Sequence, residues 1–146
     1  MADFCENCVL CQKILSRELE SHPRKVADLQ VSTAILSSNQ ICRGYCELIY
    51  NRGHVTELFR LSTEERRLFC EDLNRLAEAI YDGLQPHKLN YELLGNSVPH
   101  LHWHLIPRYL DDNLDPHWPI WDKKYKPVKI TEEAAGEIIR KIRVKL

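Results

Sequence analysis

The chain has little glycine, almost no net charge and no long run of apolar residues. Five glycines among 146 residues argue against a fibrous or disordered chain, and a formal net charge of -1 argues against a general nucleic-acid binder. No stretch reaches the roughly 20 apolar residues that span a bilayer. The first residues lack the basic and apolar regions of a signal peptide. We therefore expect a cytoplasmic protein that binds neither nucleic acid nor a membrane.

What is present is the composition of a folded protein, with 44% apolar and 28% charged residues. This length suits one domain better than two. We expect a single domain over residues 1–146, with an N-terminal segment (1–25) and a C-terminal segment (109–146) that ends in a helix. Six cysteines without a signal peptide indicate reduced thiols or metal ligands and not a disulfide framework.

Helix and strand signals alternate along the chain. A capping box at Ser62-Thr63-Glu64-Glu65 predicts a helix that ends before Pro86, and a second helix follows Thr131. A short helix is expected over 12–20. Strand candidates with short connections occupy 29–36, 45–50, 89–94 and 101–106. Because short connections favour antiparallel pairing, we expect an α+β fold in which helices cover a small antiparallel sheet.

Three histidines alternate with apolar residues in the segment His100-Leu101-His102-Trp103-His104. A strand here presents the three imidazoles on one face and the apolar side chains to the core. From spacing alone, exposed histidines or a metal site remain open alternatives to catalysis.

The flanking residues carry a more specific signal. Gly95-Asn96-Ser97-Val98-Pro99 precedes the histidines and Pro107-Arg108 follows them, so the segment resembles the signature of the histidine triad (HIT) superfamily of nucleotide hydrolases and transferases. The resemblance extends over 8–121 and is greatest to bacterial HIT-family proteins related to diadenosine-polyphosphate hydrolases. It implies a HIT-like α+β fold.

The resemblance also implies roles for the histidines. His102 matches the family's nucleophile, which attacks the α-phosphorus of a nucleotide and forms a nucleotidyl-histidine intermediate. A neutral imidazole suits this chemistry near pH 7. His104 would hydrogen-bond to a phosphate or leaving-group oxygen, and His100 would support the nucleophile and fix its tautomer.

Other polar residues near the histidines are candidates for substrate binding. Asn96 and Ser97 match family positions that contact phosphate or the leaving group, although Gly-Asn-Ser is also ordinary turn chemistry. Asn90 matches a recurrent family asparagine but could equally satisfy a strand edge. Arg108 could approach phosphate, but for it we expect an exposed side chain after a strand.

The N-terminal segment contains two overlapping C-x-x-C pairs formed by Cys5, Cys8 and Cys11. This spacing can place two thiolates on one Zn²⁺. The resemblance implies a structural zinc site of Cys8, Cys11, His54 and His100, with Cys5 in reserve, whereas unliganded thiols are the alternative. A longer turn before His54 leaves its placement open.

The run Trp118-Pro119-Ile120-Trp121 could stack on a base, but we expect it to pack a C-terminal segment on the core. Asp111, Asp112 and Trp118 are candidates to influence substrate choice.

The sequence thus predicts an enzyme that cleaves at the α-phosphate of a purine nucleotide, of the dinucleoside polyphosphate or nucleoside phosphoramidate type. Alternatives are a purine-nucleotide-binding scaffold and a metal-binding protein. We expect no organic cofactor, and we expect a homodimer, because a small sheet otherwise leaves its edges exposed.

Overall fold

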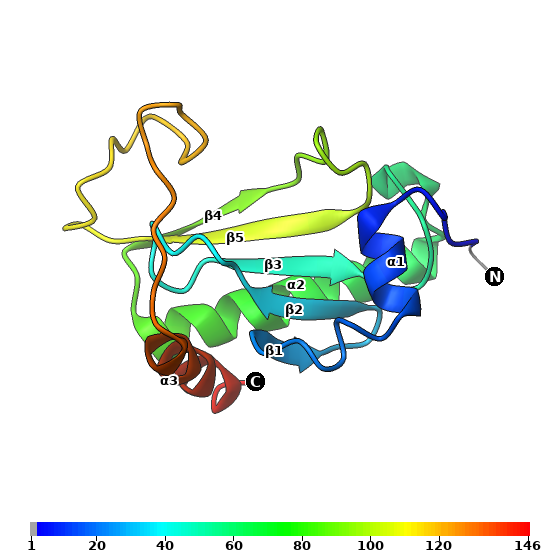
Figure 1. The fold of residues 1–146 in the computed structure, drawn as a ribbon, viewed down its shortest axis with the longest axis horizontal. Coiled ribbons are helices and arrows are strands. Elements are labelled where there is room, and N and C mark those ends of the chain that lie inside the picture. The colour runs from blue at the N-terminus through cyan, green and yellow to red at the C-terminus, as the bar shows by residue number, and fades with distance from the viewer. Residues whose placement is uncertain (1–2) are drawn as a thin grey trace.

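A five-stranded antiparallel sheet runs through the centre of the computed structural model (Figure 1), which describes residues 3–146. Its strands lie in the order β1-β2-β3-β5-β4. Their bounds are Lys25–Asp28 (β1), Ser32–Leu36 (β2), Cys46–Tyr50 (β3), Lys88–Glu92 (β4) and His102–Arg108 (β5). The helices are α1 (Val9–Leu15), α2 (Thr63–Leu84) and α3 (Glu132–Arg143), with a 3₁₀ turn η1 (Leu58–Arg60) before α2. Residues 1 and 2, at the start of the expected N-terminal segment, lie outside the described residues.

The α+β fold with helices on an antiparallel sheet is confirmed. The α2 helix begins as its capping box predicts, because the Ser62 side chain accepts a hydrogen bond from the Glu65 backbone N–H and the Glu65 side chain accepts one from the Ser62 N–H. It ends at Gln85, whose left-handed backbone (φ 56°) stops the helix before Pro86. The α3 helix is capped by the Thr131 side chain.

Two expected elements were wrong in extent. The N-terminal helix spans Val9–Leu15 instead of 12–20, since Arg17 adopts a left-handed conformation (φ 61°) that ends helical geometry. The expected strand 29–36 begins only at Ser32, and β1 before it was not anticipated. A carboxylate from α2 explains this turn, because Asp72 accepts hydrogen bonds from the backbone N–H groups of Gln30 and Val31.

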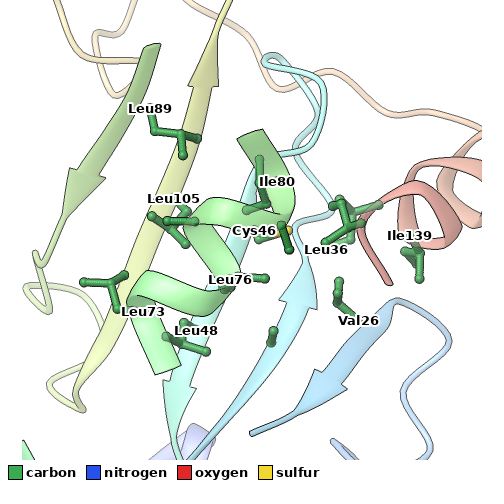
Figure 2. Packing of buried hydrophobic residues seen from close by; sticks show 14 of the residues in the cluster. Val26, Leu36, Cys46, Leu48, Leu73, Leu76, Ile80, Leu89, Leu105 and Ile139 are labelled. Atoms are coloured by element: carbon green, nitrogen blue, oxygen red, sulfur yellow. The ribbon is translucent and has the colours of Figure 1, made fainter. Parts of the chain in front are cut away.

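The core lies between the sheet and α2, which covers one face of it (Figure 1). Leu73, Leu76 and Ile80 of α2 face Leu48 and Leu105 of the sheet (Figure 2). The α3 helix lies beside the β1 edge, where Arg143 donates hydrogen bonds to the carbonyls of Lys25 and Val26. Among the described residues, no helix has both the length and the apolar character needed to cross a membrane.

Candidate functional site

A cavity of about 300 Å³ lies where β5 begins, on the sheet face opposite α2. It brings together four of the residues that the sequence singled out, His102, His104, Asn96 and Ser97. The rest of its lining is Leu94, Gly95, Val98 and Trp121. The polar groups and an apolar wall therefore share one small site.

His102 is held by the backbone just before it. Its Nδ1 lies 2.6 Å from the carbonyl oxygen of His100. A carbonyl oxygen only accepts hydrogen bonds, so Nδ1 must carry the proton. In a neutral ring Nε2 then keeps its lone pair, and His102 presents a nucleophilic nitrogen.

His104 lies beside His102, with ring centroids 4.7 Å apart and the rings nearly perpendicular. Its Nδ1 lies 2.6 Å from the hydroxyl oxygen of Tyr45, and both side chains are buried. Burial, and secondarily the neighbouring charge of His102, lowers the pKa of His104 to about 4. His104 is therefore neutral at physiological pH.

Trp121 forms the outer wall of the cavity. Its ring meets His104 edge to face at 5.0 Å between centroids, and its indole N–H donates a hydrogen bond to the Glu92 carboxylate. Trp121 is 43% exposed and Trp118 is 54% exposed, whereas Ile120 between them is buried. The run packs on the core as expected through Ile120 and through Trp121, which contacts the buried Tyr45, whereas Trp118 is mostly exposed.

His100 does not share the cavity of its two neighbours. The strand begins at His102, so the expected alternation does not extend to His100, whose side chain is almost completely buried. Its Nε2 donates to the carbonyl of Tyr50 at 2.7 Å. The Nδ1 lone pair of the neutral ring therefore faces the Sγ atoms of Cys8 (3.6 Å) and Cys11 (3.5 Å).

These contacts belong to a group of four residues that can hold a metal ion. The donor atoms of Cys8, Cys11, His54 and His100 all lie within 4.8 Å of one another. His54 reaches the group despite its longer preceding turn, with Nδ1 3.4 Å from the Cys11 Sγ. Cys5, the reserve ligand, is not one of the four. Burial raises the pKa of the Cys11 thiol to about 11, so its thiolate needs a cation beside it.

Comparison with known proteins identifies the family of this chain. Residues 18–111 match the HIT domain family, and Protein hit of Bacillus subtilis is 30% identical over 84% of this chain and 86% of its own length. The chain belongs to the HIT domain family. A histidine triad (HIT) protein from Sinorhizobium meliloti 1021 has the same fold, with a TM-score of 0.78 at 24% identity over 89% of this chain and 94% of that one. A Zn-bound histidine triad family protein from Mycobacterium smegmatis has a TM-score of 0.68 at 19% identity, covering 93% of each chain.

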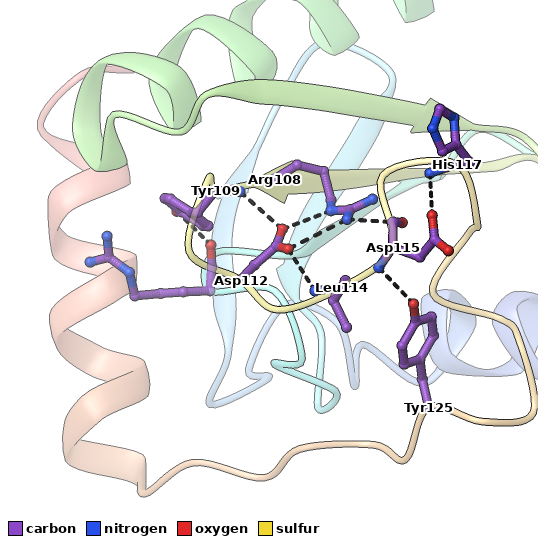
Figure 3. Close-up of polar contacts among 8 residues, drawn as sticks. Arg108, Tyr109, Asp112, Leu114, Asp115, His117 and Tyr125 are labelled. Atoms are coloured by element: carbon purple, nitrogen blue, oxygen red, sulfur yellow. Dashed lines mark hydrogen bonds and ion pairs between the residues drawn. The ribbon is translucent and has the colours of Figure 1, made fainter.

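Asn90 does not line the cavity that holds His102 and His104. It lines a different cavity of about 340 Å³, between β4 and the segment after β5, together with Arg108 and Asp112. Arg108 was expected to be exposed, yet it is only 9% exposed and its Nε lies 2.8 Å from Asp112 (Figure 3). The carboxylate of Asp112 bends the chain back over the strand, which buries the guanidinium.

Sequence reasoning did not identify Tyr45 or Glu92 as site residues, and it assigned Trp121 to packing. Tyr45 contacts His104 across 59 positions of sequence, and no local pattern marks such a pair. The run that contains Trp121 was noticed for its aromatic content. Only the position of the folded segment shows which of its tryptophans meets the histidines.

Proposed function

We propose that this chain is an enzyme that cleaves a purine nucleotide at its α-phosphate through a nucleotidyl-histidine intermediate on His102. The observation that carries the proposal is the 2.6 Å contact between Nδ1 of His102 and the His100 carbonyl. It leaves the Nε2 lone pair of His102 available in a cavity that also holds His104, Asn96 and Ser97. Membership of the HIT family supports the same chemistry.

The reaction proceeds in two displacements. Nε2 of His102 attacks the α-phosphorus, so that an N–P bond forms while the bond to the leaving group breaks and the leaving group takes the electron pair. Water then attacks the same phosphorus, the N–P bond breaks, and a nucleoside monophosphate leaves while the proton of water passes to solvent. Covalent catalysis divides one difficult step into two easier ones. Asn96 and Ser97 supply donors to the phosphoryl oxygens, where negative charge increases.

Dinucleoside polyphosphates and nucleoside phosphoramidates are the substrate types proposed. Both carry a substituent on the α-phosphate that must leave when His102 attacks. The apolar wall of Leu94, Val98 and Trp121 beside the polar groups gives such a substituent a surface to rest on.

The test compares His102→Ala with the wild type on a panel of α-³²P-labelled nucleotides. We expect nucleoside monophosphate release and an acid-labile ³²P label on the wild type, and neither on the variant, with nucleotide binding largely kept. His117→Ala is the matched control, because His117 is an exposed histidine outside the cavity. A wild type that binds nucleotide without releasing monophosphate would instead identify a binding protein.

We further propose that Cys8, Cys11, His54 and His100 hold one structural zinc ion. Two thiolates and two imidazole nitrogens are a usual tetrahedral set for this metal, and the unprotonated Nδ1 of His100 faces the sulfurs. Zinc here would join α1 to the start of β5, and the carbonyl of His100 would in turn fix His102. Thiolate ligands of this kind need a reducing compartment, which supports a cytoplasmic location.

A homodimer is the proposed assembly. The β4 edge has no further strand among residues 3–146, whereas α3 covers the β1 edge. A groove of about 460 Å³ lies between α2 and β4. Tyr81 and Tyr91 in its lining are nearly half exposed. A second copy that pairs with β4 would satisfy this edge and cover both tyrosines.

A further inference from the structure

Tyr45 contacts His104 and is not part of the cavity lining. Its hydroxyl oxygen lies 2.6 Å from Nδ1 of His104, and the tyrosine is only 2% exposed. The backbone around it is fixed, because the Tyr45 N–H donates to the Cys42 carbonyl and its own carbonyl accepts from the Ser37 N–H and from the Gln40 amide. The phenol therefore has little freedom to move away from His104.

Both groups are neutral, so the direction of this hydrogen bond depends on where the phenol hydrogen finds an acceptor. Burial raises the pKa of Tyr45 far above its ordinary value, so the phenol keeps its hydrogen. Burial lowers the pKa of His104 to about 4, so its ring carries a single proton near neutral pH. A buried hydroxyl needs an acceptor, and Nδ1 of His104, at 2.6 Å, is the atom within hydrogen-bond distance of it. Nδ1 is then the unprotonated nitrogen, and the ring proton resides on Nε2.

We propose that Tyr45 is a positioning residue that holds His104 as its neutral Nε2–H tautomer. On the proposed function, on which this inference rests, His104 then donates a hydrogen bond from Nε2 to the leaving-group oxygen or a phosphoryl oxygen. It does so as a neutral donor and not as a cationic acid.

The two neighbouring histidines thereby present opposite functions to the substrate. His102 carries its proton on Nδ1 and offers a lone pair at Nε2, whereas His104 accepts at Nδ1 and offers a proton at Nε2. When His102 forms its N–P bond, its ring gains a positive charge. A neutral His104 at 4.7 Å between centroids avoids the repulsion that a second cationic ring would create.

Two carboxylates oppose this neutral state. Glu47 of β3 and Glu92 of β4 are the cross-strand partners of His104, and a nearby carboxylate favours the imidazolium form. Glu92 is already engaged by the indole N–H of Trp121. Burial lowers the pKa of His104 most, and His102 on the same strand lowers it further. The hydrogen bond from Tyr45 further stabilises the neutral form of His104.

Nitrogen NMR of ¹⁵N-histidine-labelled protein tests the assignment without any substrate. The His104 resonances are identified as the signals that are missing from the spectrum of His104→Gln. In the wild type at pH 7 we expect a pyridine-type Nδ1 and a pyrrole-type Nε2 for His104, with no titration above about pH 5, one unit above the pKa of about 4. A pyrrole-type Nδ1 or an imidazolium ring at pH 7 would overturn the proposal.

Tyr45→Phe removes the hydroxyl and keeps the ring. We expect the two His104 tautomers to mix and the pKa of His104 to rise, because the neutral ring loses its donor. With the loss of one neutral hydrogen bond, kcat should fall by about 2- to 10-fold while KM changes little. Tyr109→Phe is the matched control, since it also loses one hydroxyl hydrogen bond, to the Arg43 carbonyl, outside the cavity.

Identical His104 spectra and kcat values in Tyr45→Phe and Tyr109→Phe would contradict the proposal. If Tyr45→Phe does not fold, the wild-type spectrum still decides the tautomer. Failure of the proposed function is separate, because it would show as missing monophosphate release and missing ³²P label in the wild type, whatever the state of His104.

Discussion

Asp112→Ala is the substitution that best tests how the segment after β5 is fastened. The Asp112 carboxylate pairs with Arg108 at 2.8 Å and accepts the backbone N–H groups of Tyr109 and Leu114, each at 3.0 Å (Figure 3). The Arg108 and Asp112 side chains are 11% and 9% exposed. Removing one partner of such a buried pair leaves the other charge without compensation, which typically costs about 3 to 5 kcal/mol.

We expect the free energy of unfolding to fall by about 3 kcal/mol, near the lower end of this range, because this irregular segment can open locally and let water reach the guanidinium. For a chain of this size that corresponds to a fall in Tm of roughly 6 to 12 °C. Replacing both partners together, as Arg108→Met with Asp112→Leu, should restore most of the lost stability, since a buried ion pair is often matched by apolar residues of similar volume.

The effect should also depend on pH in a defined direction. Burial alone would raise the pKa of Asp112, but Arg108 and the two backbone N–H groups bring it below its ordinary value of 3.8. A depressed carboxyl pKa stabilises the fold fully above the unfolded pKa and progressively less as pH falls through the folded pKa. The difference between wild type and Asp112→Ala should therefore be constant above about pH 5 and shrink below about pH 4.

Urea unfolding at pH 7 and at pH 3, with hydrogen exchange over residues 109–125, measures both the global and the local effect. Asp111→Ala is the control, because Asp111 is the exposed acidic neighbour. A loss below 1 kcal/mol for Asp112→Ala, or an equal loss for Asp111→Ala, would refute the reasoning.

Three further predictions concern the metal group, the assembly and the turn before β2. Protein purified without chelator should contain one zinc per chain, as expected for a single four-ligand site. Cys8→Ser should lose the zinc and Cys5→Ser should keep it, and equal metal content in the two variants would be inconsistent with the site. Light scattering should show a dimer that Tyr91→Lys dissociates, whereas a monomeric wild type would contradict the assembly. Asp72→Ala should lower the free energy of unfolding, measured in urea, by about 3 kcal/mol. The fully buried carboxylate accepts four hydrogen bonds, which come from the backbone N–H and the side-chain amide of Gln30, the backbone N–H of Val31 and the hydroxyl of Ser32. A loss below 1 kcal/mol would show that the turn does not depend on it.

The long helix and the pair of site histidines could be predicted because their signals are local. A capping box and helical spacing define α2 within its own sequence, and strand alternation places His102 and His104 on one face. The C-x-x-C spacing likewise marks Cys8 and Cys11 as neighbours within one turn of chain. Each of these patterns is complete within a few residues.

Other features depend on contacts between distant segments. The β1 strand exists beside β2 because Asp72 of α2 fixes the turn between them, about 40 positions along the chain. His54 and His100 lie beside the cysteines only in the folded structure, although the family resemblance indicated that they would. Periodicity tells which face a side chain takes, but it does not tell which remote segment will cover that face.

The sequence by itself determined the α+β class and the HIT family, and it identified the candidate nucleophile and the four metal-ligand candidates. The tertiary structure decided that Arg108 is buried against Asp112, that Trp121 forms a wall of the cavity and that Tyr45 contacts His104. These three outcomes share one physical reason. Each depends on where an irregular segment returns over the sheet, and such segments are positioned by hydrogen bonds to groups that local sequence patterns do not specify.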